Sequence, residues 1–351
     1  MHRQLPFDPR RPFVWRDGAR TIVFGPRSVD RVEEFLGDEY VALTTERAAA
    51  MAPALIAGAA AVHHVPAGLV DEVAGDLLGQ IGDSELLVAL GGGRVIDVTK
   101  ALAAAHGRRA AAVPTTLSAA EMTLLHRQAR GADPATGLKR PDIVINDPTL
   151  SASQSPAGLV TSALNALGHV AEAPLTIIAN PVATLAALQG GELLVRGLPE
   201  RGEPDRPALA LGALLSGYAI DQAAYGLHHV LTQTLVRYAG AEHGPANAAM
   251  LSHSLVSLRT RAPQGLEALD AALGGRSEDV AARLAARAGA ARLRRAAARH
   301  RRRPERPGAL HRQGGRGSAP RDDPAAGRSR GDRRALRARV VSATPRDRAE
   351  R

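Results

Sequence analysis

Two polar side chains stand four residues apart in the stretch TSALNALGHVAEA, which covers Thr161 to Ala173. The Ala and Leu content predicts a helix, and four residues make about one helical turn, so Asn165 and His169 would share a face. An Asp and a His at this spacing would offer a metal ion a carboxylate oxygen and an imidazole nitrogen. The first position is an amide instead. This leaves three interpretations: a metal site, a former metal site, or a helix with two polar residues.

A run of three glycines is a second candidate, because Gly91, Gly92 and Gly93 follow the apolar stretch ELLVAL and precede a helical pattern. Glycine lets a backbone approach a phosphate closely, and a helix N-terminus supplies amide donors and the positive end of a dipole. Asp97 and Lys100 follow in the first turns of this helix, where both could contact a cofactor. The run is neither GxGxxG nor a Walker motif, so a plain tight turn is the alternative.

Small hydroxyl side chains follow the next apolar stretch, AAAVP, as Thr115, Thr116 and Ser118. The carboxyl ends of parallel strands meet at one edge of an open α/β sheet, and such sheets bind ligands there. We therefore expect these hydroxyl groups to stand beside the glycine run. Together the two segments predict a nucleotide cofactor site.

The elements that must position these residues change in kind along the chain. Apolar runs predict strands at 21–25, 40–45, 85–93, 110–116 and 142–147, with helical patterns at 46–59 and 67–81 between them. Strand–helix alternation predicts a parallel sheet covered by helices. Ala- and Leu-rich segments then predict helices at 161–179, 181–198, 206–224 and 226–240. The prediction is an α/β Rossmann-like nucleotide-binding domain over 1–150, followed by an all-α domain over 151–290.

Composition excludes several kinds of site. The 351 residues contain no cysteine, so disulfides, thiolate zinc sites and cysteine nucleophiles are excluded. The N-terminal stretch lacks the apolar core of a secretory signal, and no apolar run approaches the ~18 residues of a membrane span. We therefore expect a cytoplasmic protein without a membrane partner.

The net charge of +10 belongs to the end of the chain. Residues 291–351 hold 20 Arg against six acidic residues, so the residues before them carry a net charge of −4. This tail is rich in Arg, Pro, Gly and Ala and has no aromatic residue, which predicts disorder. A shifted reading frame in a GC-rich gene would give the same mixture, and we favour that explanation. A basic arm that binds nucleic acid or membrane is the less favoured alternative.

Five motifs in order, GGGxxIDxxK, PTT, NALxH, GLxH and HGxAN, resemble those of the iron-containing alcohol dehydrogenases across Phe24 to His253. The resemblance implies that Gly91, Gly92 and Gly93 contact the pyrophosphate of NAD(P). It also implies that the three hydroxyl residues line the cofactor and that the helical domain closes over the nicotinamide.

The same resemblance implies a metal-ligand set: an Asp, a His four residues on, and two later His fourteen residues apart. In this chain the set falls on Asn165, His169, His229 and His243, so an amide replaces the carboxylate. A neutral amide is a poor ligand for a divalent ion. Maleylacetate reductases, the metal-independent branch of the superfamily, resemble this chain at SALNALGH and at the short segment PTTLSAAEMT. We predict a former metal site reused for substrate, in which any metal would be held by the three histidines.

The leading hypothesis is hydride transfer from NAD(P)H to a small carboxylated substrate similar to maleylacetate. His169, His229, His243 and Asn165 would orient the substrate, and one histidine would donate the proton. The first alternative is an iron- or zinc-dependent alcohol dehydrogenase, for which three histidines and a water suffice. The second is a non-redox relative, such as a dehydroquinate-synthase-like lyase. The third is an inactive protein that acts through its basic tail.

The choice between NAD and NADP stays open. Thr45 and Arg47 follow the second predicted strand, where many family members carry an Asp that repels the 2′-phosphate of NADP. Both cofactors are therefore candidates. For the assembly we expect a homodimer.

Overall fold

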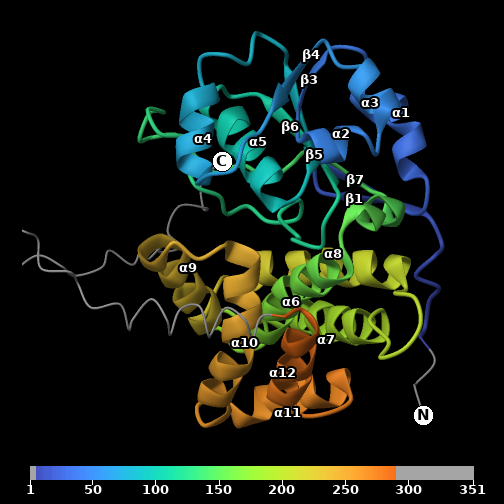
Figure 1. Ribbon diagram of the computed structural model, residues 1–351, viewed down its shortest axis with the longest axis vertical. Coiled ribbons are helices and arrows are strands. Elements are labelled where there is room, and N and C mark those ends of the chain that lie inside the picture. Colours follow the sequence, from blue (N-terminus) through green and yellow to red (C-terminus); the bar gives the residue numbers. More distant parts are fainter. Residues whose placement is uncertain (1–4, 290–351) are drawn as a thin grey trace, which may run out of the picture. The chain divides into compact units, whose positions relative to one another are not determined.

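A seven-stranded sheet occupies the first half of the chain (Figure 1). The computed structural model describes residues 5–289. The strand order is β1-β2-β7-β6-β5-β3-β4, in which β1 pairs antiparallel with β2 and the other pairs are parallel. The strands are β1 (Phe13–Asp17), β2 (Arg20–Phe24), β3 (Tyr40–Thr44), β4 (Ala61–His64), β5 (Leu86–Gly91), β6 (Arg109–Pro114) and β7 (Ile143–Asn146).

Alternate residues of the central strands belong to two different apolar clusters. Leu87 and Ala89 of β5 belong to a cluster that includes residues of α4 (Val70–Leu77) and α5 (Gly93–Ala105). Leu86, Val88 and Leu90 belong to another, with residues of α1 (Glu33–Leu36), α2 (Glu46–Ala49) and α3 (Pro53–Ala57). Successive strand side chains point to opposite faces. Helices therefore cover both faces of the sheet, which is typical of parallel sheets.

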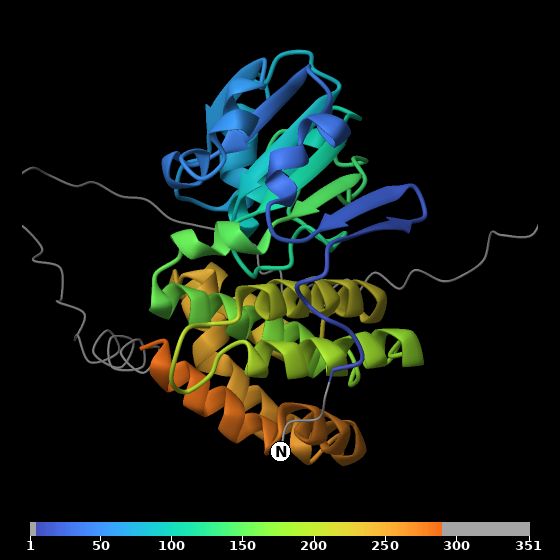
Figure 2. The same cartoon turned by 90° about the vertical axis from the view of Figure 1, so that its right-hand side faces the viewer.

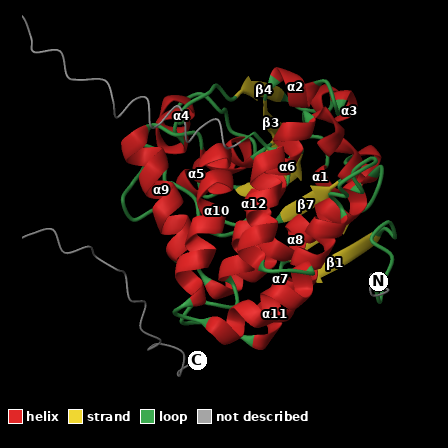
Figure 3. Cartoon of the chain, turned by 60° about the horizontal axis from the view of Figure 1, so that its bottom comes forward, coloured by secondary structure: helices red, strands yellow, loops and turns green. Residues whose placement is uncertain are grey.

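Within the described residues, seven helices follow the sheet and pack together (Figures 2 and 3). The first three begin after the capping residues Ser155, Asn180 and Asp205, and each has a proline within its first turn. Residues near each start therefore favour a helix that begins there. The helices are α6 (Pro156–Glu172), α7 (Pro181–Arg196), α8 (Arg206–Ala223), α9 (Leu227–Ala239), α10 (His243–Arg259), α11 (Pro263–Leu273) and α12 (Ser277–Arg287). Two 3-10 helices, η1 (Ser28–Arg31) and η2 (Pro148–Ser153), complete the list.

The predicted fold class is confirmed, with two differences in detail. All five predicted strands are present, whereas β1 and β4 were not predicted, because both are half-exposed or exposed and their apolar runs are at most three residues long. The helix predicted at 46–59 is two short helices. Pro53 interrupts it, because proline cannot donate a backbone hydrogen bond and disfavours helical geometry at Ala52.

The change from strands to helices falls between β7 and α6, near the predicted boundary at residue 150. The domain limits themselves stay a prediction. Across residues 5–289, none of the helices is both long enough and apolar enough to cross a membrane. The predicted tail at 291–351 lies outside the described residues.

Candidate active site

The glycine run forms the turn between β5 and α5. Gly91 ends the strand and Gly92 directly precedes the helix. A Cβ on Gly92 would lie 3.0 Å from a side-chain carbon of Thr116, and one on Gly93 would lie 3.0 Å from Cβ of Ser118. The structure therefore brings the glycine turn against the hydroxyl residues, as predicted. Only residues without a Cβ allow this close approach.

The N-terminus of α5 faces this turn without a side-chain cap, and its first turn contains no acidic residue. Its first N–H groups therefore have the charge environment that a phosphate requires. Thr115 is buried and its hydroxyl has no partner within residues 5–289, whereas Thr116 and Ser118 are half-buried. These features fit a nucleotide pyrophosphate. The cofactor roles of the individual residues stay predictions.

Lys100 has a structural role that the sequence did not indicate. Its side chain is fully buried, and its ammonium donates to Asp97 at 2.9 Å and to the backbone carbonyls of Ala120 at 3.2 Å and Leu125 at 3.0 Å. Because an ammonium has three hydrogens, these contacts use its donors. Lys100 therefore fastens the loop after Ser118 to α5. Its predicted contact with a cofactor stays a prediction.

Three polar side chains meet where α6 passes the start of α9. Asn165 and His169 are both buried on α6, on one face as predicted, and His229 is buried near the start of α9. The rings of His169 and His229 stack with centroids 4.9 Å apart and an interplanar angle of 14°. His243, the first residue of α10, is exposed, and charge on it lowers the pKa of both buried histidines. The structure therefore gathers the four predicted residues into one site.

Several atoms of this cluster have no hydrogen-bond partner within residues 5–289. They are Oδ1 of Asn165, Nδ1 of His169 and Nε2 of His229, and all three are buried. The other end of the Asn165 amide is engaged, because Nδ2 donates to the carbonyl of Ser118 at 3.0 Å. Most buried polar atoms in proteins are paired, so three unpaired atoms in one place indicate a ligand site.

Burial keeps the two inner histidines neutral. It lowers the pKa of His169 well below its usual value, and nearby histidines lower it further. Burial also lowers the pKa of His229. At neutral pH these rings are hydrogen-bonding groups rather than cations.

Tyr225 completes the cluster, although the sequence did not identify it. Its ring centroid lies 4.5 Å from that of His229 and 6.1 Å from that of His169. The preceding residue, Ala224, has φ +61° and ψ 172°, backbone angles that residues other than glycine rarely adopt. Burial raises the pKa of Tyr225, so the phenol keeps its proton. Strain at Ala224 could not be predicted from residue types.

Two further residues that sequence reasoning missed hold the histidines in place. Glu172, at the end of α6, lies 2.5 Å from Nδ1 of His229. Asn247, on α10, hydrogen-bonds to the rings of His228 and His243. The available signal was spacing: Glu172 lies three residues after His169, and Asn247 four residues after His243, each on the same helix. His228, the residue before His229 on α9, belongs to this network.

The side chains of the cluster are not arranged as a metal site. Among residues 5–289, no group of three or more His, Cys, Asp or Glu is placed to hold a metal ion. Asn165 offers only a neutral amide oxygen, and Nε2 of His243 lies 3.0 Å from Nδ2 of Asn247, from which it accepts. The donor set as placed therefore does not fit a divalent ion.

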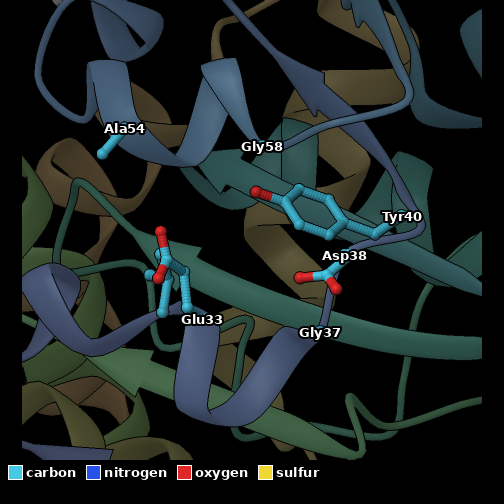
Figure 4. A pocket seen from close by; sticks show the side chains of 7 residues that line it. Glu33, Gly37, Asp38, Tyr40, Ala54 and Gly58 are labelled. Atoms are coloured by element: carbon cyan, nitrogen blue, oxygen red, sulfur yellow. The ribbon is translucent and has the colours of Figure 1, made fainter.

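A surface hollow of about 270 Å³ lies elsewhere, at the amino end of β3 (Figure 4). Glu33, Asp38 and Tyr40 line it, with Gly37, Ala54 and Gly58. Ligands of open α/β sheets bind at the opposite edge, beyond the carboxyl ends of the strands, where the glycine turn lies. The hollow is therefore separate from the candidate site.

Comparison with known proteins identifies the family. The profile described as "Fe-containing alcohol dehydrogenase family, C-terminal" matches residues 159–298, and "Iron-containing alcohol dehydrogenase" matches residues 41–126. The maleylacetate reductase of Rhizobium sp. strain MTP-10005 is 31% identical, over 80% of this chain and 87% of that protein. The maleylacetate reductase of Sphingobium indicum is 29% identical, over 75% of this chain and 80% of its own length.

The fold agrees with these matches. The crystal structure of maleylacetate reductase from Agrobacterium tumefaciens superposes with a TM-score of 0.69 at 29% identity, covering 80% of this chain and 85% of that one. The resemblance inferred from the motifs is confirmed. The chain belongs to the iron-containing alcohol dehydrogenase family and is an NAD(P)-dependent oxidoreductase that acts on CH–OH or CH–CH groups.

Proposed function

We propose that the protein reduces a small carboxylated substrate similar to maleylacetate, with NAD(P)H and without a metal ion. The observation that carries this proposal is the Asn165 amide, fixed by Ser118, beside two neutral buried histidines. Such a site offers neutral hydrogen-bonding groups to a polar substrate rather than a ligand cage for a metal. The names of the relatives reported above support the choice of substrate.

The cofactor would supply the hydride, which the reduced nicotinamide carries. The glycine turn and the N-terminus of α5 would hold its pyrophosphate. Thr116 and Ser118, packed against that turn, would line the same site. Because Ser118 also accepts a hydrogen bond from Asn165, one loop joins the cofactor end of the site to the substrate end.

The helical side would bind and orient the substrate. His169 and His229 are neutral and stacked, so they would form hydrogen bonds with the substrate without imposing positive charge. The reduction adds a hydride to one carbon and a proton to the second atom of the reduced bond. We assign the proton to His243. Its exposed ring would take up a second proton from solvent at Nε2, in place of the hydrogen bond from Asn247, and give one proton to the substrate. The expected homodimer stays a prediction.

A metal-dependent alcohol dehydrogenase is the second candidate, and one observation favours it. His169 and His229 each present a buried ring nitrogen that lacks a partner within residues 5–289. Neutral ring nitrogens are good metal ligands. If His243 released Asn247, three histidines and water could hold zinc or iron, as the sequence alternative requires.

The experiment measures NADH and NADPH oxidation by the purified protein with maleylacetate. A neutral ketone of similar length tests the need for carboxylates. H243A should lower kcat, whereas H253A, which changes an exposed histidine on the same helix, should not. Turnover of the ketone but not of maleylacetate would contradict the proposal, as would equal kcat values for the two variants.

A further inference from the structure

Glu172 is buried, and the four groups facing its two oxygens supply hydrogens. Oε1 accepts from the backbone N–H of His228 at 2.5 Å and from that of His229 at 3.3 Å. Oε2 accepts from the N–H of Gly226 at 3.1 Å and lies 2.5 Å from Nδ1 of His229. A carboxylate has about four lone-pair positions, so these groups fill them. With Glu172 ionised, this arrangement places the proton of the His229 ring on Nδ1.

The other nitrogen of the His229 ring then has a free lone pair. A neutral imidazole carries one proton, and here that proton belongs to Nδ1. Nε2 is buried and has no partner within residues 5–289. It lies in the cluster with His169 and Tyr225, whose rings flank that of His229. His229 therefore offers the site a hydrogen-bond acceptor.

Asn247 places the proton of His243 by a similar argument. Its Nδ2 lies 3.1 Å from the backbone carbonyl of His243, which can only accept, so the orientation of the amide is determined. Nδ2 also lies 3.0 Å from Nε2 of His243, which must accept. The amide oxygen lies 2.9 Å from Nε2 of His228, which must donate. His243 therefore carries its own proton on Nδ1, where it can donate.

We infer that Glu172 and Asn247 are positioning residues that give His229 and His243 opposite roles in the site. His229 accepts at Nε2, and His243 donates at Nδ1. This pair would recognise a ligand that presents a hydroxyl hydrogen near a carbonyl or carboxylate oxygen. Its catalytic consequence rests on the proposed function, whereas the proton positions do not.

Nitrogen-15 NMR of the full-length protein, labelled at histidine, reports these positions directly. Couplings from the carbon-bound ring hydrogens distinguish Nδ1 from Nε2, and the nitrogen without a proton resonates far downfield. Spectra of H229Q and H243Q assign the two rings. In the unaltered protein we expect protonated Nδ1 and unprotonated Nε2 on both. A proton on Nε2 of either ring would overturn the inference, and the proton positions themselves are measured in the unaltered protein.

Two reciprocal variants test which residue sets which proton. In E172Q the backbone N–H groups hold the new carbonyl oxygen, and the amide N–H faces Nδ1, so the proton of His229 should move to Nε2. In N247D the carboxylate should draw the proton of His243 to Nε2 while that of His229 stays on Nδ1. D205N, which keeps a good helix cap at a partly buried hydrogen bond at the start of α8, should change neither ring.

Activity provides the second readout. E172Q should lower kcat roughly 10- to 100-fold, as loss of a carboxylate behind a functional histidine commonly does, and should leave NADH affinity unchanged. An unmoved proton on His229 in folded E172Q would overturn the role of Glu172. Equal loss of NADH binding would also overturn it, because that result indicates general damage. If the unaltered protein shows the expected protons but no turnover of maleylacetate, the proposed function fails and the inference stands.

Discussion

The side-chain amide of Asn165 donates to the backbone carbonyl of Ser118 across 3.0 Å. This bond connects α6, which carries His169, to the loop that packs against Gly93. The amide therefore does what a carboxylate at the same place could not, because a carboxylate has no hydrogen to donate. In this chain the amide at the position of an expected metal ligand therefore also connects α6 to the loop beside the glycine turn.

Replacing Asn165 by Asp should weaken the fold and strengthen metal binding together. The carboxylate would face the carbonyl of Ser118 without a hydrogen, which should cost about 1–3 kcal/mol of unfolding free energy. It would also stand one turn from His169 and supply the missing ligand for zinc. Urea denaturation with and without Zn²⁺ measures both effects. N180D, at a helix cap that tolerates Asp, is the control, and equal stabilities of the two variants would refute the role of the amide.

Adding a methyl group at Gly92 should impair cofactor binding. The new Cβ would lie 3.0 Å from the side chain of Thr116, so the turn or the loop must shift. Overpacking of this kind costs about 1–3 kcal/mol, and if the cofactor needs the unshifted turn we expect roughly a tenfold or greater loss of NAD(P)H affinity. Fluorescence titration with NADH and NADPH measures the affinity of each variant for the cofactor. G79A, where a Cβ meets nothing within 4 Å, should bind as the unaltered protein does, and so should G92A if the turn does not hold the cofactor.

Replacing Lys100 by Met should destabilise the protein even without cofactor. The change leaves Asp97 and the carbonyls of Ala120 and Leu125 without their buried donor, for an expected loss of about 3–5 kcal/mol. Lys139, the other lysine of the chain, forms a partly exposed pair with Asp142, so K139M should cost less than about 1 kcal/mol. Chemical denaturation of the cofactor-free proteins gives both values. A K100M variant of full stability that lost only cofactor affinity would restore the predicted direct contact.

The helical part should lose stability in acid through Glu278. Burial alone would raise the pKa of Glu278, but hydrogen bonds from Arg259 and Arg276 outweigh it and lower this pKa to about 2. A carboxyl whose pKa is lower in the folded state stabilises the fold above its unfolded pKa of about 4.5. That contribution, of about 2 kcal/mol, is lost as the pH falls toward about 2.

E278Q should therefore be less stable than the unaltered protein at pH 7 and nearly equal to it near pH 2. Urea denaturation across this range gives the difference. E267Q, which changes an exposed carboxylate on α11, should follow the unaltered protein throughout. A constant difference between E278Q and the unaltered protein at every pH would show that Glu278 does not carry the acid sensitivity.

Periodicity and spacing predicted much of this site. The apolar runs located β5 and β6, and the rule that ligands bind at the carboxyl edge of such a sheet placed Gly92 beside Thr116. Helical spacing placed Asn165 and His169 on one face of α6. Each of these features follows from residue spacing within short segments of the chain, so the sequence alone was sufficient to predict them.

The remaining features depend on contacts between distant segments. Glu172 reaches His229 across 57 residues of chain, and no local pattern indicates that pairing. The spacing of Lys100 from the glycines predicted a contact with the cofactor. The carbonyls that accept from its ammonium belong to Ala120 and Leu125, in a loop that the spacing does not reveal. Tyr225 owes its position to the backbone of Ala224, which a residue type does not reveal.

The central claim is that this site reduces its substrate without a metal ion. The most direct measurement is NAD(P)H oxidation with maleylacetate before and after prolonged treatment with a chelator, with the metal content of the same samples determined. We predict unchanged turnover in protein that holds far less than one equivalent of metal. Turnover that disappears with the chelator and returns with zinc or iron would contradict it.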